Sequence, residues 1–237
     1  MRILKNKEIE DIVALRLADY ETSNDKVSVP ICVDSIIEHC GLSILYDIIE
    51  ERHGETILGG LNIKEKLIVL NEKHMKLFQE KPGLERSTKA HELGHWDIYA
   101  KKISENASLS FDFCEDTKQM VLRNSKQGFL SVLLTAWIDE DAYNVYKEYT
   151  NRKDHPYVES AVDRYASYLL MPEHLIKDYA LYSDLTNYRN LYKMAEQFEV
   201  TISALCVRLQ RLNIIYIRDN KIYKSKGEAV GQPALPF

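Results

Sequence analysis

The sequence predicts an α+β fold, with a small amino-terminal β-sheet packed on long helices and a helical carboxyl-terminal half that ends in a β-hairpin. Three observations support this prediction. Short β-branched or leucine-rich runs precede residue 71, segments with helical spacing of apolar residues follow residue 83, and two short apolar runs flank a turn near the carboxyl end. The chain has 237 residues, 45% of them hydrophobic, so it can bury a core of its own.

The amino-terminal third is expected to hold two helices and three strands. Apolar residues at helical spacing predict a helix over 6–19, and a second short helix over 33–40 ends at Gly41. The three runs that read as strands are separated by charged residues and by Gly59 and Gly60, and they cover 42–46, 56–63 and 66–70. The last of them, Leu-Ile-Val-Leu, is predicted to be the central strand of the sheet.

Two longer helices are predicted in the middle of the chain. One covers 84–102, after a Pro-Gly turn signal, and the other covers 158–170, where Pro172 ends the apolar pattern. Between them, 103–127 reads as polar and irregular, 128–149 as one or two helices, and 151–156 as a turn.

The carboxyl-terminal part is predicted to contain two short helices and a hairpin. The helices cover 188–198 and 201–212, and the hairpin strands cover 214–217 and 221–223. The last eleven residues, 227–237, read as a flexible tail.

Composition narrows the classes of function. The net charge of −5 argues against broad binding to nucleic acid, because such binding rests on Lys and Arg that neutralise phosphates. The four cysteines form no C-x-x-C pair, which favours reduced thiols. The first eleven residues include three acidic ones where a signal peptide is apolar, and the longest apolar run, 128–138, is shorter than the ~20 residues of a membrane span. We therefore expect a cytoplasmic protein with no membrane partner.

An HEXXH motif, His91-Glu92-Leu93-Gly94-His95, lies inside the predicted helix over 84–102. Residues four apart share one face of a helix, so His91 and His95 can offer two imidazoles to one metal ion. A glutamate in the position of Glu92 takes a proton from the attacking water and passes it to the leaving amine, as general base and acid. The motif predicts a zinc-dependent metalloendopeptidase.

A catalytic zinc needs a third protein ligand. The H-E-x-x-H-x-x-G-x-x-H extension is excluded because Ile98 and Lys101 stand where it requires Gly and His. Glu159 and Asp163 are four apart on the predicted helix over 158–170, so Glu159 can bind zinc while Asp163 accepts a hydrogen bond from a ligating histidine. Glu140 with Asn144 has the same spacing, and spacing does not choose between the two pairs.

Two segments resemble the signature segments of the ImmA/IrrE family of metallopeptidases. They are Arg86-Ser87-Thr88-Lys89-Ala90 followed by HELGHW, and Glu159 to Asp163 followed by RYASYLLMP. The resemblance implies zincin-type active-site helices and Glu159 as the third ligand. It also implies regulatory proteolysis inside the cell, with a specific protein, a helix-turn-helix transcriptional repressor, as the substrate.

The resemblance extends more weakly to 30–41, 63–71 and 198–212. The chain departs from the family in the roughly sixty residues between His95 and Glu159, a connection longer than the family usually shows. We therefore expect one metallopeptidase domain over 1–226 with an insertion at 103–156. Manganese or iron is also compatible with two histidines and one carboxylate.

Catalysis also needs a hydrogen-bond donor that stabilises the oxyanion of the transition state, and we expect it close to the third ligand in the sequence. The candidates are His155, Tyr157, Tyr165 and His174.

A second hypothesis is a non-enzymatic protein, an anti-repressor or a DNA-binding regulator, whose metal site is structural or vestigial. Residues 191–212 and the hairpin after them resemble a winged helix-turn-helix, and the second helix carries Arg208 and Arg211. The acidic net charge argues against nucleic acid as a partner.

Overall fold

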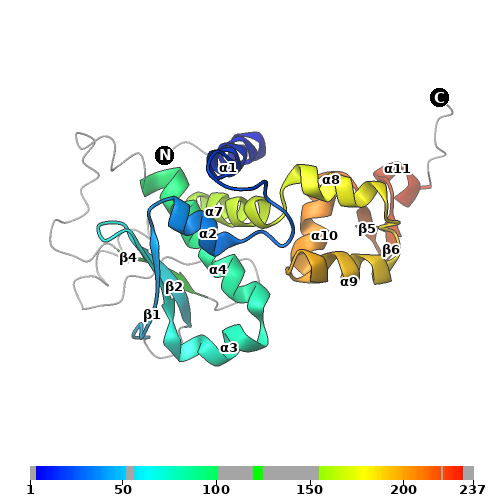
Figure 1. Ribbon diagram of the computed structural model, residues 1–237. Helices are drawn as coiled ribbons and strands as arrows, with labels where there is room; N and C mark the ends of the chain where they lie inside the picture. The colour runs from blue at the N-terminus through cyan, green and yellow to red at the C-terminus, as the bar shows by residue number, and fades with distance from the viewer. Residues whose placement is uncertain (1–3, 52–55, 101–119, 125–154, 220, 232–237) are drawn as a thin grey trace.

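The computed structural model describes residues 4–51, 56–100, 120–124, 155–219 and 221–231 (Figure 1). The described chain is mixed α and β, with a sheet in the amino-terminal part, helices in the carboxyl-terminal half and a closing hairpin, as predicted. None of the helices in these ranges combines the length and the apolar character that a membrane crossing requires.

The amino-terminal helices and strands form where the sequence predicts them. Gly41 ends the second helix in the left-handed region, at φ +71°, which glycine adopts without strain. The elements are α1 (Asn6–Glu21), α2 (Val33–His39), β1 (Ser43–Asp47), β2 (Ile57–Asn62) and β3 (Leu67–Asn71). β3 lies inside the sheet, parallel to β1 and antiparallel to β2, so its prediction as the central strand is confirmed.

A fourth strand, β4 (Met120–Asn124), pairs antiparallel with β2 and gives the sheet the order β1-β3-β2-β4. The prediction that 103–127 is irregular throughout was therefore wrong at β4. The strand is only five residues long and lies in a polar stretch, so its sequence shows no clear strand pattern. Hydrogen bonding to β2 stabilises it as a strand. The rest of the predicted insertion before His155, including the helices expected over 128–149 and the alternative ligand Glu140, lies outside the described residues.

A short helical turn and two helices follow the sheet, and the second helix carries the HEXXH motif. These elements are η1 (Glu72–His74), α3 (Met75–Glu80) and α4 (Pro82–His95), and α4 continues as the π-helix η2 (Trp96–Ala100). Pro82 is the first residue of α4, where its missing N–H costs no hydrogen bond. The helix predicted over 84–102 is thus present, and its last described turn has π geometry.

The carboxyl-terminal half contains α7 (His155–Leu170), α8 (Glu173–Leu181), α9 (Tyr188–Gln197), α10 (Ile202–Arg211), the hairpin of β5 (Tyr216–Arg218) and β6 (Lys221–Tyr223), and α11 (Lys226–Ala229). The turn predicted over 151–156 was wrong at its end, since α7 begins at His155 with proline as its second residue, a favoured place. The tail predicted from 227 was wrong at its start, because Ser225 caps α11 by accepting from the backbone N–H of Glu228.

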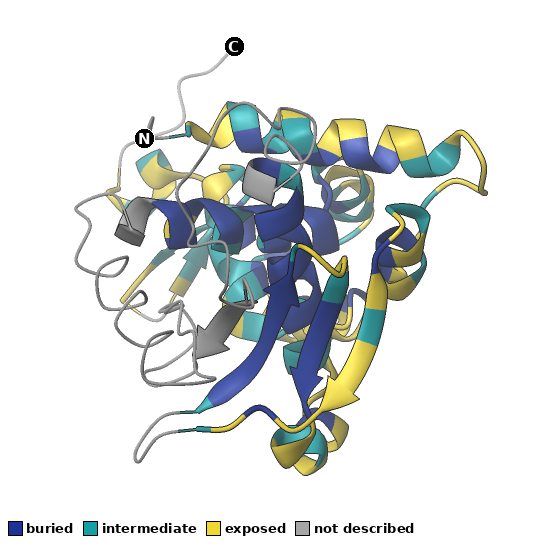
Figure 2. Cartoon of the chain, turned by 90° about the vertical axis from the view of Figure 1, so that its left-hand side faces the viewer, coloured by how far each residue is buried: buried dark blue, intermediate teal, exposed yellow. Residues whose placement is uncertain are grey.

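Helices α4 and α7 form the centre of the fold, with α4 also lying against β2 and β3. Every residue of α4 from Thr88 to His95 is buried. In Figure 2 the inner strands β2 and β3 are largely dark blue, whereas the edge strand β1 is largely exposed. The HEXXH motif is therefore enclosed between the sheet and α7.

Candidate metal centre

Helix α4 presents two histidines to one point. His91 and His95 are four residues apart and thus one turn apart along α4. Their side chains are 1% and 5% exposed, and their Nε2 atoms lie 3.1 Å apart. Two imidazole nitrogens are therefore held together in the interior, as the motif predicts.

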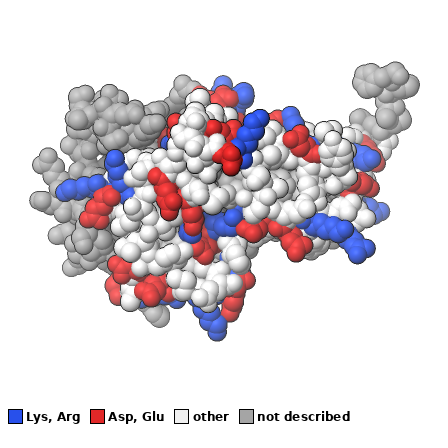
Figure 3. Space-filling view, in the orientation of Figure 1, with Lys and Arg blue, Asp and Glu red and all other residues white. Residues whose placement is uncertain are grey.

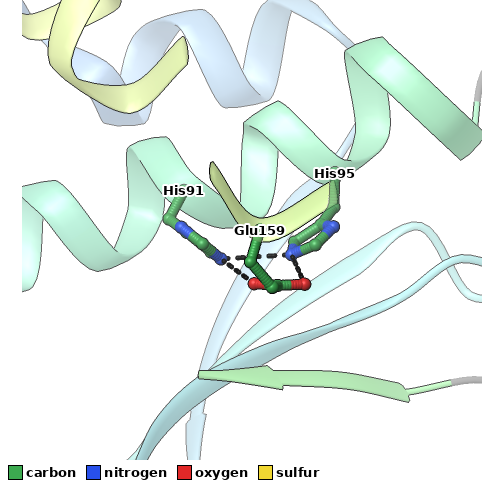
Figure 4. A group of neighbouring side chains, drawn as sticks. All are labelled: His91, His95 and Glu159. Carbon is green, nitrogen blue, oxygen red and sulfur yellow. Dashed lines mark hydrogen bonds and ion pairs between the residues drawn. The ribbon is translucent and has the colours of Figure 1, made fainter. Parts of the chain in front are cut away.

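Helix α7 supplies a carboxylate to the same point. Glu159 is also buried, and its Oε2 lies 3.5 Å from Nε2 of His91 while its Oε1 lies 3.8 Å from Nε2 of His95. Figure 4 shows the three side chains pointing toward one another, the histidines from α4 and Glu159 from α7. The structure thus brings Glu159 to the histidines, as predicted.

The three residues fit a metal ion. One ligand atom from each lies within 4.8 Å of the others. A tetrahedral zinc ion, bound at 2.0–2.2 Å, holds its ligand atoms about 3.4 Å apart. The two Nε2 atoms lie 3.1 Å apart, and the two oxygens of the Glu159 carboxylate lie 3.5 Å from Nε2 of His91 and 3.8 Å from Nε2 of His95. A buried group of two histidines and one glutamate at these distances could hold a metal ion.

Asp163 lies behind His91. Its Oδ1 is 3.1 Å from Nδ1 of His91, on the side of the ring opposite the nitrogen that faces Glu159. A carboxylate at Nδ1 accepts the ring N–H, which leaves Nε2 with its lone pair for a metal. The helical spacing of Glu159 and Asp163 gives each carboxylate a different contact with the same histidine.

Gly94 lets the two helices approach each other. A Cβ atom at this position would lie 2.9 Å from Cδ1 of Tyr165 and 3.0 Å from Cγ1 of Val162, both on α7. A side chain at residue 94 would therefore push α7 away from α4. Gly94 therefore has a packing role: it allows α7, the helix that carries Glu159, to lie close to α4.

Glu92 is fully buried on α4, between the two histidines in sequence. A general base needs a fixed place beside the reacting water and a site that excludes bulk solvent. The burial of Glu92 meets the second requirement.

Lys89 anchors the preceding turn of α4. Its buried ammonium lies 2.7 Å from Glu85 and 2.9 Å from Asp34 of α2, and the hydroxyl of Tyr46 donates to Glu85. Burial alone would lower the pKa of Lys89, but these partners raise it above its ordinary value. For Glu85, burial alone would raise the pKa of the carboxyl group. The hydrogen bonds from Lys89 and Tyr46 outweigh burial, so the pKa of Glu85 lies below its ordinary value. Both side chains are therefore charged at neutral pH.

Asp97 and Arg16 form a contact that no motif in the sequence indicates. The Asp97 carboxylate accepts from Arg16 of α1 and from the hydroxyl of Tyr165 of α7. Burial first, and then the charge of Asp97, raises the pKa of Tyr165 well above its ordinary value, so the hydroxyl stays a donor. Arg16 and Asp97 are 81 residues apart, and no spacing rule connects them.

Of the four candidates for transition-state stabilisation, the structure describes the side chains of Tyr165 and His174. The hydroxyl of Tyr165 is committed to Asp97. His174 is exposed on α8. His155 and Tyr157 lie on the first turn of α7, and their side chains are outside the described part of the structure.

Arg208 does not project from α10 as a DNA-reading residue would. Its side chain is 1% exposed, it stacks 4.0 Å from the centre of the Tyr168 ring, and it donates to the carbonyl of Met171 and to Glu10. Arg211 is exposed. Figure 3 shows acidic and basic side chains interspersed over the visible described surface, without an extended basic area there.

No family model matches this chain, and the curated proteins contain no match to it either.

Proposed function

We propose that this protein is a zinc-dependent endopeptidase that acts in the cytoplasm on a specific protein substrate. The observation that carries the proposal is the buried convergence of His91, His95 and Glu159 within 4.8 Å, with Glu92 in the same turn of α4. Three protein ligands leave a fourth position open, which is the arrangement of catalytic rather than structural zinc sites.

In this proposal each residue has a separate task. His91, His95 and Glu159 hold the metal, and Asp163 orients His91 through Nδ1. When bound, zinc polarises the scissile carbonyl and lowers the pKa of water toward ~7. Glu92 takes a proton from the water whose oxygen attacks the carbonyl carbon, and it then passes that proton to the amine nitrogen as the C–N bond breaks.

The substrate class comes from the resemblance to the ImmA/IrrE family in the segments around His91 and Glu159. We propose a helix-turn-helix transcriptional repressor as the protein that is cleaved. Nucleic acid is not proposed as a partner, and the burial of Arg208 in α10 supports this choice.

The substitution Glu92→Gln tests the proposal. Glutamine keeps the shape of the side chain but cannot accept and return a proton, so we expect kcat to fall by about 10²- to 10⁴-fold with zinc content unchanged. The assay incubates the zinc-loaded protein with purified helix-turn-helix repressors of the source organism and identifies new amino termini by mass spectrometry.

The matched control is Glu173→Gln, a partly exposed glutamate on α8. This variant should cleave at the rate of the unaltered protein. Cleavage by Glu92→Gln at that same rate would contradict the proposal, and it would favour the non-enzymatic hypothesis with a structural metal.

A further inference from the structure

A buried charged cluster joins three helices at the end of α4. The Asp97 side chain is 4% exposed, and Arg16 of α1, 8% exposed, donates from Nε to Oδ2 at 2.8 Å and from a terminal nitrogen to Oδ1. Tyr165 of α7 donates its hydroxyl to the same Oδ2. One carboxylate therefore connects α1, the π-helical end of α4 and α7.

The cluster stands close to the metal centre without belonging to it. Asp97 follows His95 by two residues, which is roughly half a helical turn, so the two side chains leave the helix on nearly opposite sides. Tyr165 follows Glu159 by six residues, and its ring fills the space over Gly94. The helices α4 and α7 are thus joined twice, by the metal ligands on one side and by the Asp97–Tyr165 contact on the other.

Stability alone does not account for this cluster. Removing two charges from water is costly, and replacing a buried ion pair by apolar residues of similar volume is often neutral or stabilising. A satisfied polar network differs from apolar packing in fixing one geometry, because its hydrogen bonds act only at set distances and angles. A metal site needs such a fixed geometry, because its ligands must be held within about 0.5 Å.

We propose that Asp97 is a positioning residue of the metal centre. By holding Arg16 and Tyr165 it fixes the end of α4 against α7, and this sets the distance between His95 and Glu159. The inference rests on the proposed metal site, and it adds Asp97 and Arg16, which lie outside both the motif and the segments that carry the family resemblance.

The substitution Tyr165→Phe tests the inference with the least disturbance, since it removes the hydroxyl and leaves the ring against Gly94. The control is Tyr168→Phe, which removes another buried tyrosine hydroxyl three residues along α7. Each protein is titrated with zinc against a chromophoric chelator, its cobalt form is examined by visible absorption, and the melting temperature of its metal-free form is measured.

We expect Tyr165→Phe to raise the zinc Kd about tenfold and to change the cobalt spectrum, as substitution of residues that orient metal ligands does. Tyr168→Phe should keep the zinc Kd and the spectrum of the unaltered protein. The double variant Asp97→Ala with Tyr165→Phe should bind zinc no more weakly than Asp97→Ala alone, because both changes remove the contact between the Tyr165 hydroxyl and residue 97.

An unchanged zinc Kd and cobalt spectrum in Tyr165→Phe would overturn the positioning role, even if the melting temperature falls. Equal weakening by Tyr168→Phe would overturn it too. Either result would leave the proposed function standing, whereas failure of the unaltered protein to bind zinc would overturn both.

Discussion

His91 uses both of its ring nitrogens. Nε2 faces Glu159 and His95, and Nδ1 faces Asp163. A histidine in such a place is held in one tautomer and one orientation, which would leave the lone pair of Nε2 for a metal ion. Glu159 and Asp163, one turn apart on α7, divide these two tasks between them.

We therefore predict that Asp163→Ala raises the zinc Kd by about 10- to 100-fold, because Nδ1 loses its acceptor while all three ligands remain. Chelator competition measures the change. The control is Asp178→Ala, an exposed aspartate on α8, and equal Kd values for the two variants would contradict the role of Asp163.

Helical spacing predicts those residues of the candidate site that share one face of a helix. His91 and His95, and Glu159 and Asp163, each lie four apart, and this spacing is fixed by helix geometry. The choice of Glu159 over Glu140 came from family resemblance, since the spacing is the same in both pairs. Asp97 and Arg16 could not be predicted, because their contact depends on how α1 packs on the end of α4.

The packing of α4 on α7 decides how closely the two halves of the centre approach. Val162 and Tyr165 of α7 occupy the space that a side chain at residue 94 would need. The same contact keeps the ring of Tyr165 close to Asp97. Gly94 therefore serves both the fold and the metal site.

The substitution Gly94→Ala should lower the free energy of unfolding by about 1–3 kcal/mol, because the added methyl group overpacks the contact with α7. Urea unfolding measures the loss. The control is Gly227→Ala in α11, where the nearest atom to an added Cβ is 3.8 Å away and where alanine improves the helix. If the Gly94→Ala protein is as stable as the unaltered one, α7 can move to accommodate the methyl group, and the predicted overpacking is wrong.

Helix α10 is fixed to the rest of the protein by Arg208. The guanidinium lies on Tyr168 and reaches Met171 and Glu10, so it joins α10 to α7 and α1. The helix pair that resembles a winged helix-turn-helix is thus present, but the arginine expected to be available to DNA is part of the core.

Accordingly, Arg208→Ala should destabilise the protein by about 3 kcal/mol, since it leaves Glu10 without its partner and removes the stacked group. Its neighbour Arg211 is exposed, and Arg211→Ala should change stability by less than about 0.5 kcal/mol. Thermal and urea unfolding distinguish the two variants. If both lose the same stability, the assigned role of Arg208 is wrong.

The sequence predicts an element that is long enough to show helical periodicity or that an apolar run beside a turn residue marks, as in α2 and the strands β1 to β3. α1, α4, α7, α9 and α10 have ten residues or more, enough for helical periodicity to show. α3, α8 and β4 have six, nine and five residues, and they were missed. Pro172, which ends the apolar pattern of α7, also stands at the N-cap position of α8. The S-x-x-E pattern from Ser225 to Glu228 indicates the start of α11.

Across the whole molecule, α1 connects the parts that carry the centre. Arg16 ties it to Asp97 at the end of α4, Arg164 of α7 donates to Asn6 and to the carbonyl of Leu4, and Arg208 of α10 reaches Glu10. An amino-terminal helix far from the motif in sequence thus contacts the end of α4, α7 and α10. These long-range ion pairs and hydrogen bonds have no local sequence pattern, and so the sequence predicted the helix but not its contacts.

The metal content of the purified protein tests the central claim most directly. We predict a single zinc ion per chain by elemental analysis, with X-ray absorption showing two imidazoles and a carboxylate oxygen at about 2.0–2.2 Å. His91→Ala, His95→Ala and Glu159→Ala should each lose the metal, and Glu140→Ala should keep it. A protein without bound metal, or one that loses zinc with Glu140→Ala and retains it with Glu159→Ala, would contradict the account.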